Sequence, residues 1–65
     1  MIRLKNQNSH GVVEYTITEL EDINNLPKKS IATGSTAEGI IDSKLAVYYF
    51  TEGNGDNEGK WDKIA

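Results

Sequence analysis

The 65-residue chain contains no cysteine and only one histidine, His10. Without cysteine it has no disulfide and no thiolate metal site, and one histidine cannot build a zinc site by itself. A chain of this length buries only about 60% of the surface that its unfolded form exposes, so small folds often depend on disulfides, metals or oligomerisation. Because the composition leaves oligomerisation as the remaining common route, we expect contact with other protein.

The sequence also lacks long apolar runs and an excess of positive charge. No run approaches the roughly 18 apolar residues of a membrane span, and the first six residues lack the apolar core of a signal peptide. The formal net charge of −3 argues against a generic nucleic-acid binder, which would carry a basic stripe. We therefore expect one small domain over residues 1–65, with no membrane partner and no nucleic-acid partner.

What the sequence does contain is a series of strand patterns. Residues 12–18 alternate apolar and polar side chains, which is typical of a strand with one buried face. A turn is expected at residues 42–44, and a polar loop with an Asn-Gly turn signal at residues 53–59. The expected strands are residues 1–4, 12–18, 37–41, 45–51 and 60–64.

One short helix is predicted between the second and third of these strands. Thr18 and Glu21 match a capping box, and Pro27 ends the helix because it disfavours the helical conformation of Leu26. The sequence thus predicts a mostly β, small α+β fold: an antiparallel sheet or small curled barrel of four to five strands with one short helix. The expected core is Val13, Tyr15, Ile17, Leu20, Ile23, Leu26, Ile41, Leu45, Val47 and Trp61.

Residues 45–51 are apolar on both faces of their strand. If Leu45, Val47 and Tyr49 face the core, then Ala46, Tyr48 and Phe50 face outward. Two explanations have equal weight: the sheet curls into a barrel that covers both sets, or the outward set contacts another chain. The second explanation predicts an interface at Ala46, Tyr48 and Phe50, which we extend to the edge-strand residues Ile2 and Leu4.

Candidate chemistry is weak throughout the chain. Ser9, His10 and Glu14 could be arranged as a nucleophile, base and acid, but a solvent-exposed loop histidine explains His10 more simply. Asn54, Asp56 and Glu58 resemble the first half of a calcium loop, but the loop has no glutamate at its twelfth position. No phosphate-binding glycine motif is present. We expect no enzymatic activity, no cofactor, no metal and no catalytic residue.

The order and spacing of several short motifs resemble a small β module of tailed-bacteriophage virion proteins. The resemblance covers residues 18–64 and includes a short acidic helix ending in Leu-Pro, a tyrosine-rich strand and a final Gly-x-Trp hairpin. The matching residues are Leu26-Pro27, Gly34-Ser35-Thr36-Ala37, Asp42, Lys44-Leu45, Tyr48-Tyr49 and Gly59-Lys60-Trp61.

The resemblance implies a non-enzymatic structural role of the head-fibre, capsid-decoration or tail-associated type. The expected protein is made in the host cytoplasm and located in the virion, on the capsid surface. Its expected partners are further copies of itself, as a dimer or trimer, a major capsid protein, or another virion protein. The alternative is a small cytoplasmic inhibitor or adaptor that binds a protein through an exposed strand edge.

Overall fold

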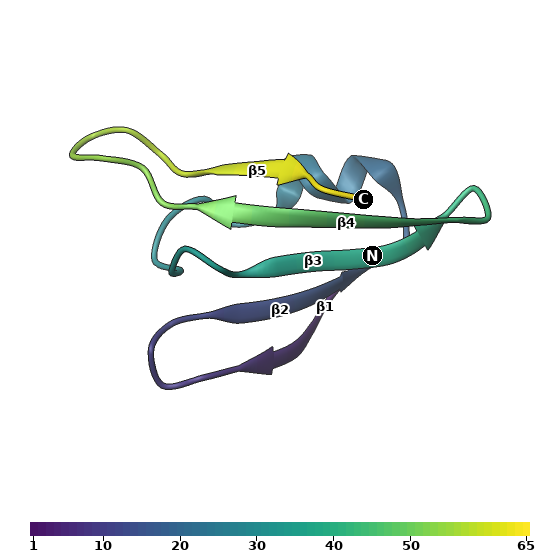
Figure 1. The fold of residues 1–65 in the computed structure, drawn as a ribbon, viewed down its shortest axis with the longest axis horizontal. Coiled ribbons are helices and arrows are strands. Elements are labelled where there is room, and N and C mark those ends of the chain that lie inside the picture. The colour runs from purple at the N-terminus through teal and green to yellow at the C-terminus, as the bar shows by residue number, and fades with distance from the viewer.

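The protein forms one mixed five-stranded sheet with a single short helix on one face (Figure 1). The computed structural model describes all 65 residues. The strands lie in the order of the sequence, and the sheet stays open at both edges, so it is not a barrel. The predicted fold class is confirmed. The elements are β1 (Ile2–Gln7), β2 (Val13–Ile17), η1 (Leu20–Asn25), β3 (Thr36–Ile41), β4 (Lys44–Thr51) and β5 (Lys60–Lys63).

Three of the four strand pairs are antiparallel, and β2 and β3 are parallel. Parallel neighbours need a crossover, and the chain makes it through the 3-10 helix η1 and the irregular residues 26–35. This crossover covers one face of the sheet, which we call the helix face. The other face, which we call the open face, has no element packed on it (Figure 1).

The helix begins one residue later than predicted. Glu19 rather than Thr18 is the N-cap residue, and the backbone N–H groups of Thr18 and Glu19 both donate to the carboxylate of Asp22, at 3.1 and 3.0 Å. The N-terminal amine of Met1 also lies 2.7 Å from that carboxylate. Although Asp22 is buried, these donors satisfy its carboxylate, and they fasten the end of β2 to the helix.

The same contacts predict an acid-sensitive contribution to stability. The N-terminal amine, helped by the two backbone donors, holds the pKa of Asp22 below its ordinary value and outweighs the opposite effect of burial. The stabilisation is therefore complete above the unfolded-state pKa of about 3.9 and is lost as the pH falls through the lower folded-state pKa. Glu21 contributes with the opposite sign, because Glu19 raises its pKa.

A pair of urea denaturation series from pH 7 to pH 2 isolates this contribution. We expect Asp22→Asn to have a lower midpoint than the parent chain near neutral pH, with a difference that shrinks toward pH 2. A difference that stays constant over the whole range would contradict the assigned role. Glu21 is present in both proteins, so only the small part of its pKa shift that the Asp22 charge causes differs between them.

The core lies between the helix face and the crossover. Val13, Ile17 and Leu26 are buried as predicted. Trp61 packs its ring against Phe50 and Tyr15, with centroids 5.1 and 6.3 Å apart, and donates a hydrogen bond of 3.0 Å to the carbonyl of Pro27. This bond, together with the one from the Gly59 N–H to the Lys28 carbonyl, fastens the crossover to the edge of β5.

A buried serine connects the crossover to the sheet. The Ser35 side chain accepts a hydrogen bond from the Val13 N–H at 2.9 Å and donates one to the Ala32 carbonyl at 2.8 Å. Its own carbonyl accepts from the Phe50 N–H at 2.9 Å. Buried polar groups cost free energy unless they are paired, and here the pairing fixes where the crossover enters β3.

The predicted assignment of the two faces of β4 is wrong. Ala46, Tyr48 and Phe50 lie on the helix face and are buried, whereas Leu45 and Tyr49 lie on the open face and are exposed. The physical reason is steric. Ala37 and Gly39 on β3, with Ala46 beside them, form a shallow floor on which the crossover and the Tyr48 ring can pack.

The remaining expected core residues are exposed or half-buried. Leu20, at the start of η1, is exposed, and so is Leu45. Tyr15, Ile23, Ile41 and Trp61 are half-buried and pack against the core, and Val47 is half-buried on the open face.

Candidate protein-interaction surface

The open face carries the largest group of exposed aliphatic and aromatic side chains. Strand alternation and the pairing of β3, β4 and β5 place these residues on one side. Ile40 is directly opposite Leu45 in the β3–β4 pair, and both are more than half exposed, at 64% and 56%. We call the group the apolar patch; it consists of Ile40, Leu45, Val47, Tyr49 and Ile64.

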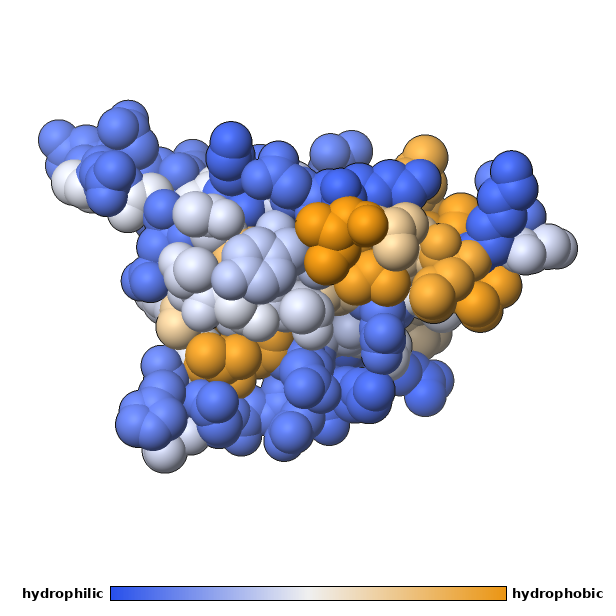
Figure 2. All heavy atoms as spheres, in the orientation of Figure 1, coloured by the Kyte–Doolittle hydropathy of each residue, from blue (hydrophilic) through white to orange (hydrophobic).

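Figure 2 shows this face of the molecule. Hydrophobic side chains gather over β3 and β4, towards the hairpin that joins them, and hydrophilic side chains surround them. An apolar centre with a polar border is the usual anatomy of a protein–protein interface.

The half of the open face formed by β1 and β2 is charged. Lys5 on β1 donates a hydrogen bond of 3.1 Å to the Glu38 carboxylate on β3, across the intervening strand. This bond and the nearby charge of Glu14 raise the pKa of Lys5 above its ordinary value. Because both side chains remain substantially exposed, the pair contributes little to stability, and it instead marks a polar edge beside the apolar patch.

The molecule exposes about a tenth more surface than its mass predicts. Its accessible surface is 4505 Å². A monomeric protein of 7.2 kDa is expected to expose about 4,100 Å² by the usual scaling with mass. The molecule measures 37 × 23 × 18 Å, and the open face is one of its two broad sides. A standard interface buries about 800 Å² on each partner, and a face of this size can supply that area.

The structure places the predicted interface residues in three different environments. Ala46, Tyr48 and Phe50 are covered by the chain itself, so they do not form the outward interface that the sequence predicts. Ile2 is half-buried and packs against the core, and Leu4 is exposed on the edge strand β1. Leu45, Val47 and Tyr49 were assigned to the core because the two faces of β4 were exchanged.

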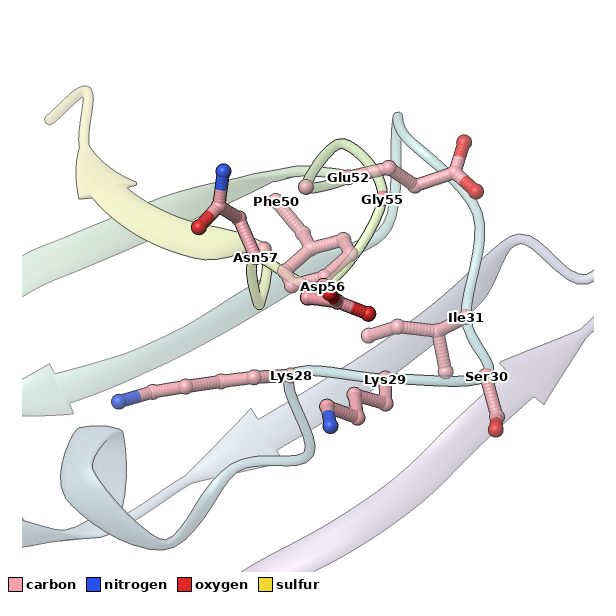
Figure 3. A pocket seen from close by; sticks show the side chains of 11 residues that line it. Lys28, Lys29, Ser30, Ile31, Phe50, Glu52, Gly55, Asp56 and Asn57 are labelled. Atoms are coloured by element: carbon pink, nitrogen blue, oxygen red, sulfur yellow. The ribbon is translucent and has the colours of Figure 1, made fainter.

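A polar hollow lies between the crossover and the loop from β4 to β5 (Figure 3). This polar cleft has a volume of about 450 Å³, and Phe50 forms part of its wall. Figure 3 shows Asp56 reaching from the loop toward Ile31, whereas the amino groups of Lys28 and Lys29 point away from the cleft. Its charged lining residues form no ion pair with one another, and we assign the cleft no ligand.

The other candidate residues are not brought together. The structure contains no group of three His, Cys, Asp or Glu residues that could hold a metal ion, and Asp56 and Glu58 share no such group. His10 lies in the exposed turn between β1 and β2, where its backbone N–H donates to the side chain of Asn8 at 2.8 Å. The His10 ring makes no hydrogen bond with Ser9 or Glu14.

Comparison with known proteins finds no matching family model, no similar curated protein and no similar solved structure. No helix of the structure has the length and apolar character needed to cross a membrane. The geometry of the chain itself is therefore the basis for a functional proposal.

Proposed function

We propose that the protein is a non-enzymatic structural component that associates with further copies of itself through the apolar patch. The observation that supports this is the exposed pair Ile40 and Leu45, which lies beside Val47 and Tyr49 on a face that no other element covers. In a second copy the same patch is available, so the two can meet in an isologous contact, as most homodimers do.

Two open faces that meet would form a two-layer β-sandwich. The side chains of two inner sheet faces interdigitate across a core about 10 Å thick. In such a sandwich the patch would become a second hydrophobic core, and the Lys5–Glu38 pair would lie at its polar border. This arrangement supplies the burial that a 65-residue chain without disulfides lacks.

The resemblance to tailed-phage virion modules supports placing this assembly on the surface of a virus particle, in a decoration, head-fibre or tail-associated role. On such a particle the patch could also dock on another virion protein. Mass spectrometry of purified particles tests the location: peptides from residues 18–64 are expected among the virion proteins. Their absence from particles, together with abundance in the infected-cell lysate, would contradict it.

Ile40→Glu is the variant that tests self-association. We expect the parent chain to sediment as a dimer or larger assembly at micromolar concentrations, and Ile40→Glu to dissociate it. Burying an unpaired carboxylate at the centre of an interface costs about 2 kcal/mol or more, which is roughly a thirtyfold loss of affinity. Because Ile40 is exposed in the single chain, circular dichroism should remain that of the parent.

Leu20→Glu is the matched control. Leu20 is as exposed as Ile40 but lies on the helix η1, at the other side of the sheet. It receives the same charge change, and we expect no effect on the sedimentation of the assembly. A parent chain that remains a monomer at hundreds of micromolar, or a control that dissociates as readily as Ile40→Glu, would contradict association through the patch.

A further inference from the structure

The helix face is left partly uncovered at the end where β3 turns into β4. A 3-10 helix of six residues is about 12 Å long at 2.0 Å per residue, and the molecule is 37 Å long. Beside the first helical residue, Leu20, a hollow therefore remains, with exposed Leu20 and Leu45 at its rim and the largely buried Ala46 and Tyr48 at its bottom. The opening, which we call the hairpin-end groove, has a volume of about 300 Å³.

Apolar side chains form most of this groove, and two lysines stand beside them. Its apolar lining consists of Leu20, Ile41, Leu45, Ala46 and Tyr48, and its charged residues are Asp42, Lys44 and Lys63. The apolar lining continues the hydrophobic core outward: Ala46 and Tyr48 belong to the buried core cluster, and Leu20 and Leu45 are exposed beside them.

The two lysines of the groove have no ionic partner in the chain. The ion pairs of the structure involve Lys5, Lys60 and the N-terminal amine, and neither Lys44 nor Lys63 takes part in one. The chain as a whole carries a formal charge of −3, so two unpaired cations against one aspartate at an apolar opening are a local reversal of sign. A ligand that complements the groove has aliphatic groups and carboxylates.

We propose that the hairpin-end groove binds an extended acidic segment of a partner protein that carries aliphatic side chains. One aliphatic side chain displaces water from Leu20, Ile41 and Leu45, and flanking carboxylates pair with Lys44 and Lys63. The site is separate from self-association through the apolar patch, because its floor is on the opposite face of the sheet; only Leu45 borders both.

The test is a titration of the ¹⁵N-labelled chain with a short peptide, followed by NMR. The probe is an acetylated and amidated hexapeptide in which two central leucines are flanked by two glutamates on each side. We expect saturable shifts of the amides of Lys44, Leu45, Ala46 and Lys63, with dissociation constants of about 10⁻⁴–10⁻³ M, which correspond to a shallow groove of this size. Raising the salt concentration to about 0.5 M should weaken binding severalfold.

Matched peptides and variants decide the outcome. A peptide with lysines in place of the glutamates, and one with serines in place of the leucines, should each bind at least tenfold more weakly. The double variant K44E/K63E should lose binding tenfold or more, while K28E/K29E, with the same charge change at exposed positions, should bind as the parent does.

Three results would overturn the proposal. The first is the absence of shifts at millimolar peptide, and the second is equal binding of the lysine peptide. The third is the appearance of the same shifts when the unlabelled chain alone is concentrated, which would make a second copy the occupant. Shifts confined to the apolar patch count against the groove and leave the self-association test by Ile40→Glu unaffected.

Discussion

Phe50→Ala should be the most destabilising side-chain truncation in the chain. Phe50 is the largest fully buried side chain, with 1% of its surface exposed. Truncating a buried phenylalanine costs about 3–5 kcal/mol, because the transfer free energy is lost and a cavity remains. Domains have roughly 0.05–0.15 kcal/mol of stability per residue, so a chain of 65 residues has about 3–10 kcal/mol in total.

The position of Phe50 explains why neighbouring side chains cannot compensate for the lost free energy of unfolding. Its ring meets Trp61 of β5 and stands against Gly59, and its backbone is hydrogen-bonded to both Gly34 and Ser35 of the crossover. The residue therefore joins β4, β5 and the crossover. A cavity there removes contacts from all three at once, and a molecule with only one layer of cover cannot refill it.

Tyr49→Ala is the matched control for this prediction. Tyr49 is the adjacent aromatic residue of the same strand, but it points to the open face and is 37% exposed. At concentrations where sedimentation shows monomer, we expect its unfolding midpoint in urea to fall by less than half as much as that of Phe50→Ala. A folded Phe50→Ala together with an unfolded Tyr49→Ala would contradict the assignment of faces in β4.

The length of one turn explains why the sequence predicts the strand correctly but exchanges its faces. A three-residue turn at residues 42–44 would pair Glu38 with Tyr48. The structure instead has a two-residue turn, in which Asp42 and Ser43 have φ of 53° and 65°, and Glu38 pairs with Val47. Neither residue is glycine, so the turn lacks the usual signal of a two-residue hairpin. A slip of one residue moves every side chain to the other face.

Other parts of the fold were predictable because local signals decide them. The alternation of residues 12–18 gives β2 with its buried face, and Pro27 marks the end of the helix region. The exposure of Leu20 was not predictable in this way. In a 3-10 helix residues three apart point in the same direction, so Leu20 and Ile23 share one side of η1, but only Ile23 packs against the core cluster.

For the interaction surface, too, local sequence predicts some features, and others depend on residues that are distant in the sequence. The sequence indicates correctly that β4 is apolar on both sides, since Leu45 and Phe50 belong to one short strand. Which side stays exposed depends on small residues of β3 and on the path of the crossover, both of which act through space. The excess apolar surface was thus predictable, whereas its location at Ile40 and Tyr49 required the register.

Gly39→Ala should be the second most damaging change, although it adds only one methyl group. A Cβ atom at Gly39 would overlap the carbonyl oxygen of Ile17, at the point where the chain leaves β2. The obstacle is backbone, which cannot rotate aside, so β2 and β3 would have to separate. Overpacking of this kind costs about 1–3 kcal/mol and can cost more when backbone must move.

The loss of local stability should be largest in the parallel pair β2–β3. β2 and β3 are joined by only three register pairs, the last of which is Thr16 with Glu38, directly beside Gly39. We expect amide hydrogen exchange in β2 to accelerate by tenfold or more, because about 1.4 kcal/mol of local stability corresponds to each factor of ten. The β3–β4 hairpin should keep most of its protection, since its six pairs lie on the other side of β3.

Glu38→Ala provides the comparison at the neighbouring residue. It removes the exposed bond with Lys5, which is worth at most about 1 kcal/mol, and it adds no atom to the contact with Ile17. We expect nearly unchanged exchange in β2. If Gly39→Ala exchanged no faster than Glu38→Ala, the close approach of Ile17 to β3 would be wrong, and with it the crossover that leaves one face of the sheet open.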